Sequence, residues 1–181
     1  MKKNKQPKSL QNMNSGFTLV EMILYIAIVA IFMTGLVYFT LDIVYGREKS
    51  YVHQEVNQNT RFAAKRIAYE IKNAKSIISP LSGSSSSISL EYADANRNPT
   101  VINISGDGRI TIGYGSSGNC PTSSPCFLTG NKVNVTAINF TNLSSGNSTN
   151  VKFSLTIEGV GDAIENQKIE NFETSVELRS K

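Results

Sequence analysis

The sequence has few charged residues and very few of the residues that catalytic sites use. Of its 181 residues, 18% are charged, one is a histidine and two are cysteines. Sparse charge argues against a cytosolic enzyme rich in Glu and Lys, and 22 Ser and 18 Asn make the surface neutral and polar instead. The sequence shows no Ser/His/Asp arrangement of the kind used in nucleophilic catalysis, and no glycine-rich phosphate-binding loop before a helix. The residues therefore predict a protein that is not an enzyme and that needs no cofactor.

A basic leader precedes one long uncharged segment. Residues 1–16 contain no acid and four lysines, which are Lys2, Lys3, Lys5 and Lys8. From Met22 to Leu41 there are twenty consecutive uncharged, mostly apolar residues, and Glu21 stands immediately before them. Twenty helical residues extend about 30 Å, which is the thickness of the hydrocarbon core of a bilayer. Because the run is apolar on all faces, it predicts a membrane-spanning helix rather than a buried helix of a soluble core.

The charges around this segment predict its orientation. The basic leader is expected on the cytoplasmic side, so that the rest of the chain lies outside the cytoplasm. A secretory signal is the competing interpretation, but it needs a shorter apolar stretch and a small-x-small cleavage site, whereas Ala27 and Ala30 lie inside the run. The net charge of +4 belongs entirely to residues 1–16, since the remainder has fourteen basic and fourteen acidic residues. The charge thus gives no support to a nucleic-acid partner.

The two cysteines agree with a domain outside the cytoplasm. Cys120 and Cys126 are close enough in sequence for a disulfide that closes a short loop in an oxidising compartment. The alternative is a pair of unpaired loop thiols. Zinc is disfavoured because no nearby His or second Cys pair completes the site. A tight turn explains the Gly-Asp-Gly at residues 106–108 better than a calcium loop does, because calcium needs several oxygen ligands. The sequence thus predicts no metal site.

The junction between the leader and the apolar segment reads Ser15-Gly-Phe-Thr-Leu-Val-Glu21. It resembles the processing site of type IV prepilins and pseudopilins, in which the cut precedes the apolar segment. The matching features are the short basic leader, Gly16 before the cut, Phe17 after it, Glu21 fifth in the mature chain, and the apolar run that follows. The resemblance by motif covers residues 1 to about 45 and beyond them rests on architecture.

The resemblance implies a role for each of three residues. Gly16 is the last leader residue, which prepilin peptidase recognises at the cytoplasmic face of the membrane, and its lack of a Cβ lets the extended chain enter a protease cleft. Phe17 becomes the free, N-methylated amino terminus. Glu21 attracts the N-terminal amine of a neighbouring subunit during filament assembly, because a carboxylate near the end of a membrane segment needs a partner or a proton. The other interpretation of Glu21 is an interfacial side chain that reaches the headgroups.

Two features indicate which members of this family the chain resembles most. Major pilins often have a kinking proline in the helix, at the position that Tyr38 occupies here, and no proline occurs between Pro7 and Pro80. An unkinked helix is therefore expected, and a minor subunit is favoured over the major pilin. The late strands, Val151-Lys-Phe-Ser-Leu-Thr-Ile157 and a terminal strand ending at Arg179, look most like those of the J group of minor pseudopilins.

The apolar segment is expected to continue as an amphipathic helix. Between Arg47 and Ile78, apolar residues recur at steps of three and four, with one lapse at Asn59. Pro80 and Gly83 are expected to end the helix. This stripe predicts that the second half of the helix packs against a globular domain. Its apolar members are Val52, Val56, Ala63, Ile67, Ile71, Ala74 and Ile78.

After a Ser/Gly linker at residues 82–87, the apolar period changes from that of a helix to that of strands. The alternation slips near Ala137, where a β-bulge would restore its phase. The expected fold class is α+β: a long N-terminal membrane-spanning helix packed on an antiparallel sheet of about six strands, as in pilins. The expected strands cover residues 88–92, 102–104, 110–114, 133–140, 151–157 and 172–178.

These patterns divide the chain into four expected segments. They are a basic leader at 1–16, a transmembrane and assembly half of the helix at 17–42, an amphipathic half at 43–80, and a β-rich extracytoplasmic globular domain at 81–181.

Two functions of different classes fit this organisation. The first is a minor pilin or pseudopilin, cut by prepilin peptidase and assembled into a type IV pilus, a type II secretion pseudopilus or a DNA-uptake filament. Its partners are then other pilin subunits, the peptidase, the inner-membrane assembly platform and membrane lipid. Its location is the inner membrane, as a single-pass protein, and then an extracytoplasmic filament. The second is a solitary membrane-anchored binding domain that does not assemble.

Overall fold

The computed structural model describes residues 16–116, 118, 120, 126–145, 148–160 and 168–179. Residues 1–15 of the expected leader lie outside this description. The chain divides into two units, Met1–Tyr45 and Gly46–Lys181.

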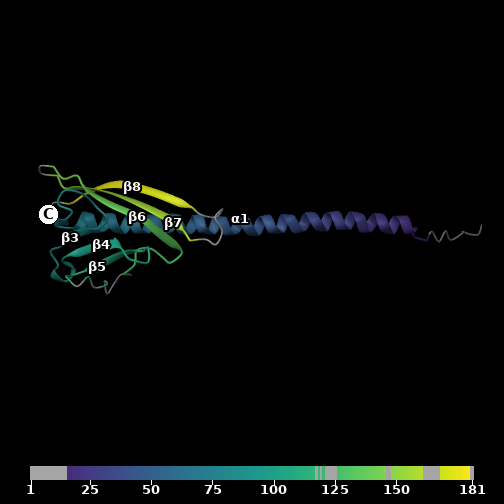
Figure 1. Cartoon of the computed structure of the whole chain (residues 1–181), viewed down its shortest axis with the longest axis horizontal. Coiled ribbons are helices and arrows are strands. Elements are labelled where there is room, and N and C mark those ends of the chain that lie inside the picture. Colours follow the sequence, from purple (N-terminus) through teal and green to yellow (C-terminus); the bar gives the residue numbers. More distant parts are fainter. Residues whose placement is uncertain are drawn as a thin grey trace, which may run out of the picture. The chain divides into compact units, whose positions relative to one another are not determined.

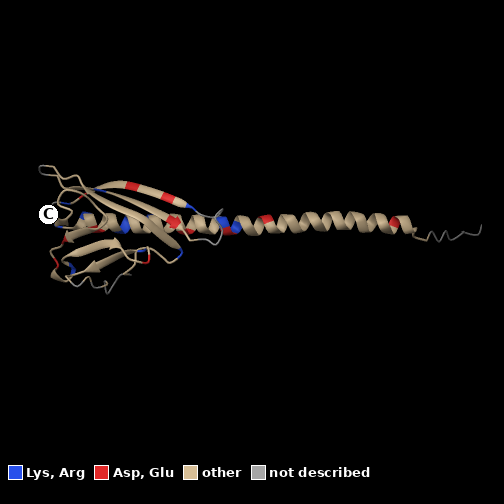
Figure 2. Cartoon of the chain, viewed as in Figure 1, with Lys and Arg blue, Asp and Glu red and all other residues tan. Residues whose placement is uncertain are grey.

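One helix, α1 (Leu19–Asn73), begins in the first unit and ends in the second (Figure 1). The helix continues without interruption through Tyr38, the position at which major pilins often have a kinking proline. Every residue from Gly16 to Tyr45 is exposed, and Figure 2 shows a long stretch of α1 without charged side chains. Among the described residues, α1 is the one helix that is long and apolar enough to cross a membrane.

The helix ends at Asn73, before its predicted end at Ile78. The backbone N–H of Lys75 donates to the carbonyl of Glu91 over 2.7 Å, so the chain pairs with a strand two residues after the helix. Ile78 lies in β1 (Ser76–Ser79) and is 43% exposed. The prediction was wrong here because a short apolar run fits a helix and a strand equally well, and strand pairing decides between them.

In the described residues eight strands form two antiparallel sheets of four strands, where the sequence predicted one sheet of about six. Sheet A has the order β1-β3-β4-β5 and sheet B the order β2-β6-β7-β8. The short strand β2 (Gly83–Ser85) lies within the predicted linker, where small polar residues give no periodic signal. The α+β class is confirmed. The other elements are β3 (Ile88–Glu91), the 3₁₀ turn η1 (Ala95–Arg97), β4 (Thr100–Ile104), β5 (Ile110–Tyr114), β6 (Val133–Asn142), β7 (Asn150–Gly159) and β8 (Ile169–Glu177).

The predicted β-bulge is confirmed in the pairing of β6 with β7, whose register shifts between Val135 and Ala137. The extra residue restores the alternation, so that apolar side chains on both sides of it face the core. Those side chains are Val133, Val135, Ile138 and Phe140.

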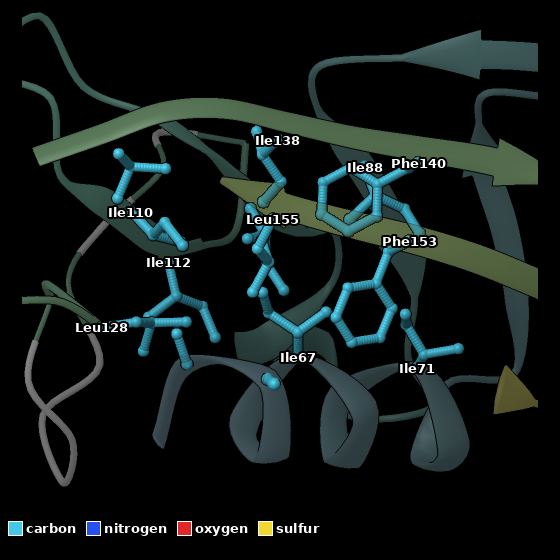
Figure 3. Packing of buried hydrophobic residues seen from close by; sticks show 14 of the residues in the cluster. Ile67, Ile71, Ile88, Ile110, Ile112, Leu128, Ile138, Phe140, Phe153 and Leu155 are labelled. Atoms are coloured by element: carbon cyan, nitrogen blue, oxygen red, sulfur yellow. The ribbon is translucent and has the colours of Figure 1, made fainter. Parts of the chain in front are cut away.

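Both sheets pack beside the second half of α1 and share one apolar core (Figures 1 and 3). Ile67 and Ile71 of the helix are completely buried in it. Burial of a side chain of this size contributes about 1.5–3 kcal/mol. The strand residues of the same core that Figure 3 labels are Ile88, Ile110 and Ile112 from sheet A, and Ile138, Phe140, Phe153 and Leu155 from sheet B.

Gly159 and Asn59 allow the end of a strand and a loop to approach the helix closely. A Cβ on Gly159 would lie 2.4 Å from Cγ1 of Val52, so only glycine allows β7 to end against α1. Asn59, the polar lapse in the predicted apolar stripe, accepts a hydrogen bond from the backbone N–H of Gly130 over 2.7 Å. The polar residue in the apolar stripe therefore has a structural role, because its side chain holds the loop before β6.

One carboxylate of α1, that of Glu70, is completely buried at the boundary with sheet A. Its oxygens lie 2.9 Å from the Arg66 guanidinium and 2.6 Å from the Arg97 guanidinium. The Tyr92 hydroxyl donates to the Glu70 side chain, and burial together with this hydrogen bond raises the pKa of Tyr92. The Arg97 guanidinium also lies 4.9 Å from the Tyr114 ring centroid. This cluster compensates the buried charge and joins the helix to sheet A.

Replacing Glu70 by Gln is expected to lower the free energy of unfolding by about 3 kcal/mol, because two partly buried guanidinium groups lose their counter-charge. Chemical denaturation of the full chain in detergent measures this loss. Glu91→Gln is the matched control, because it breaks an exposed pair with Lys75 and is expected to have a much smaller effect. Equal losses in the two variants would contradict a special role for the buried cluster.

Candidate processing and assembly site

The residues predicted for cleavage lie immediately before the helix. Gly16 and Phe17 are exposed and non-helical, and α1 starts two residues later at Leu19. The Phe17 ring lies 5.9 Å from the ring of Tyr25, in the second turn of the helix. A Cβ on Gly16 would meet no atom within 4 Å. Nothing in the described part of the chain therefore requires a glycine at this position.

Thr18 caps the start of the helix, a role that the sequence analysis missed. Its Oγ1 and its backbone carbonyl both accept from the backbone N–H of Glu21, over 3.3 and 3.1 Å. A threonine followed three residues later by a glutamate is the sequence signature of a helix start, so the signal was present. The Glu21 carboxylate thus lies in the first turn, where the positive end of the helix dipole favours it.

The carboxylate of Glu21 is the one charge in the apolar stretch from Phe17 to Leu41. It is exposed, and among the described residues no cation pairs with it. The hydrogen bonds at the start of the helix explain why Glu21 lies in the first turn, but they do not neutralise the charge of its carboxylate. A carboxylate in this position is therefore available to a cation from another molecule.

Cys120 and Cys126 form a disulfide, with their Cα atoms 4.8 Å apart. The carbonyl of Cys126 accepts from the backbone N–H of Ile112 over 2.9 Å, and the N–H of Leu128 donates to the carbonyl of Ile110 over 2.7 Å. The chain that follows the disulfide therefore pairs with the outer edge of β5. In the part of the chain that the structure describes, no group of three or more His, Cys, Asp or Glu side chains is arranged to hold a metal ion.

Comparison with family models matches residues 11–37 to the prokaryotic N-terminal methylation motif. The matched segment contains the predicted cleavage position and Glu21. Neither the curated proteins nor the solved structures contain a match to this chain. The motif and the apolar helix together support a pilin-like, membrane-anchored subunit that prepilin peptidase processes.

Replacing both Cys120 and Cys126 by serine is expected to lower the free energy of unfolding by about 2 kcal/mol, because the disulfide restricts a seven-residue loop in the unfolded chain. Denaturation curves of the variant and of the oxidised and reduced native chain measure this effect. The reduced native chain should behave like the variant. A variant as stable as the oxidised chain would show that the bond adds nothing to the fold.

Proposed function

We propose that this chain is a minor pilin or pseudopilin, a structural subunit that prepilin peptidase cuts between Gly16 and Phe17. The mature subunit assembles with other pilin subunits, through the inner-membrane assembly platform, into a type IV pilus, a type II secretion pseudopilus or a DNA-uptake filament. The observation that carries this proposal is the Glu21 carboxylate, which has no cationic partner among the described residues and stands at the start of an exposed apolar helix inside the matched motif.

The position of Glu21 supports assembly rather than a solitary anchor. Leaving its carboxylate uncompensated in a membrane segment costs several kcal/mol. Cleavage after Gly16 creates an amine at Phe17, four residues before the carboxylate and at the same end of the helix. The amine of one subunit and the carboxylate of its neighbour then neutralise each other when the helices pack side by side. The pair provides a reason for association that a lone subunit in lipid lacks.

The surroundings of Gly16 support processing by an external enzyme. The described chain leaves open space around this residue, so its small size is explained by a protease cleft rather than by the fold. The disulfide supports a globular domain in an oxidising space outside the cytoplasm. The basic leader then lies on the cytoplasmic side of the inner membrane, where the cut occurs.

The continuous helix supports a minor rather than a major subunit. Tyr38 stands inside α1 at the position where major pilins often have a proline. Within the minor subunits we place the chain nearest the J group of pseudopilins, on the alternating sequence of β7 and the terminal strand β8.

The mature membrane-bound protein is expected to begin at an N-methylated Phe17. N-terminal sequencing and intact-mass measurement of the membrane fraction test this. Expression without prepilin peptidase is the control and should leave Met1 in place. An intact Met1 in the presence of the peptidase, or a cut after residue 30, would overturn the proposal in favour of an unprocessed anchor or a secretory signal.

Replacing Glu21 by Ala is expected to leave cleavage intact and to reduce incorporation into filaments about tenfold or more, because the amine of the neighbouring subunit loses its counter-charge. The amount of the chain in sheared filaments, compared with that in the membrane, measures incorporation. Asp42→Ala, at the other end of the apolar stretch, is the matched control and should assemble normally. Normal incorporation of the Glu21 variant would contradict the pairing.

A further inference from the structure

Strand β8 forms the longest open sheet edge among the described residues. It is the last strand of sheet B, has nine residues and pairs with β7 on one side (Figure 1). The other sheet edges are short or covered. β1 has four residues and β2 has three, while β5 is covered by the chain after the disulfide, through the backbone of Ile110 and Ile112. An open edge of this length is a template on which another chain can form a strand.

The register of β7 and β8 shows which backbone groups face the open edge. The N–H of Gly159 donates to the carbonyl of Lys168, and the N–H of Leu178 donates to the carbonyl of Thr149, both over 2.9 Å. Because bonded and non-bonded positions alternate in an antiparallel pair, the even-numbered residues of β8 bond to β7 and the odd-numbered ones direct their N–H and C=O groups away from it. Among the described residues, no backbone group of another segment bonds to these outward-directed groups. They belong to Ile169, Asn171, Glu173, Ser175 and Glu177.

A groove of about 290 Å³ lies along this edge, between β8 and α1, and we call it the β8 groove. Its residues are Arg61, Ala64, Lys65, Ala68 and Lys72 from α1 and Phe172, Thr174, Ser175 and Val176 from β8. Ser175 is one of the residues whose backbone groups point away from β7. Its place in the lining shows that the groove reaches the open edge. A strand that pairs with β8 from outside therefore lies over the groove.

The helix wall of the β8 groove is basic. Arg61, Lys65 and Lys72 follow one another at steps of four and seven, so they share one side of α1. All three are exposed, and in the described part of the chain none of them forms an ion pair. Between the two lysines, Ala68 leaves space for a side chain from outside. The groove thus fits a segment with acidic side chains at its ends and a small apolar one between them.

We propose that the β8 groove binds an extended segment of another protein, which adds to β8 as a further strand and directs two acidic side chains to Lys65 and Lys72. The added strand lies about 4.8 Å beyond β8, and alternate side chains point from it towards α1. The two lysines are seven residues apart, or about 10 Å along the helix, and strand residues four apart are separated by about 13 Å. The flexible lysine side chains span this difference. The residue midway between the two acids lies over Ala68.

The open edge determines what kind of molecule fits. A nucleic acid or an anionic sugar can pair with lysines, but it lacks the backbone groups that bond to a row of N–H and C=O groups. A second copy of β8 does not meet the charge requirement, because it would direct Phe172, Thr174 and Val176 to the groove. The surface lies entirely in the unit Gly46–Lys181, so it requires neither cleavage nor filament assembly. It adds a binding role for the globular unit to the proposed structural one.

A synthetic peptide, Thr-Glu-Thr-Val-Thr-Glu-Thr, tests the charges. Fluorescence polarisation measures its binding to the purified full chain in detergent. The double variant Lys65→Glu with Lys72→Glu is expected to bind it at least about tenfold more weakly, and to bind Thr-Lys-Thr-Val-Thr-Lys-Thr more tightly than the native chain does. Lys49→Glu with Lys132→Glu is the matched control, because both lysines are exposed and lie outside the groove. This variant should bind the acidic peptide within about twofold of the native chain.

Methylation of the peptide backbone tests strand addition separately from charge. One acidic peptide carries an N-methyl group on its central valine, and a second carries it on the threonine before the valine. Alternate amides of a strand face opposite sides, so only one of the two should lose affinity, by about tenfold. Equal effects of the two methyl groups, no binding of the unmodified peptide, or equal binding by the double variant would overturn the inference. None of these outcomes affects the proposed function, which N-terminal sequencing and filament incorporation test independently.

Discussion

The structure depends on one uninterrupted helix that must be stable in two different surroundings. From Met22 to Leu41 the helix is uncharged, mostly apolar and exposed, so it requires lipid or other helices around it. From Val52 onward it buries a stripe of side chains against two sheets. No proline interrupts α1, and Thr18 provides the hydrogen bonds that its first turn would otherwise lack. The processing, anchoring and assembly that we propose all use this one element.

The side of the helix that the sheets cover determines which side remains for other molecules. The buried carboxylate of Glu70 holds α1 to sheet A, and the close approach at Gly159 holds it to the end of β7 in sheet B. These contacts fix how the helix is rotated within the globular unit. Glu48, Tyr51, Lys65 and Lys72 remain exposed as a consequence of that rotation.

Prediction from the sequence was most successful where one strong pattern excluded the alternatives. Twenty uncharged residues after a basic leader predict a membrane-spanning helix, and the cleavage motif was then matched by the methylation-motif family model. The slip of alternation at Ala137 predicted a bulge that the β6–β7 register contains. Prediction failed where local patterns were short. The run at Ser76–Ser79 fitted a helix as well as a strand, and Gly83–Ser85 had no apolar alternation that would reveal β2.

The sequence by itself determined the class of fold, the apolar and amphipathic halves of the helix, and the motif at its start, because these are carried by neighbouring residues along the chain. The tertiary structure decided the division into two sheets, the end of the helix at Asn73 and the partners of Glu70. Those features depend on contacts such as that of Lys75 with Glu91, which join residues distant in sequence. A groove of about 290 Å³ between α1 and β8 also belongs to this group, since its two walls are about a hundred residues apart along the chain. Spacing along one helix shows which residues share a side, but only the packing of the sheets shows which of them remain exposed.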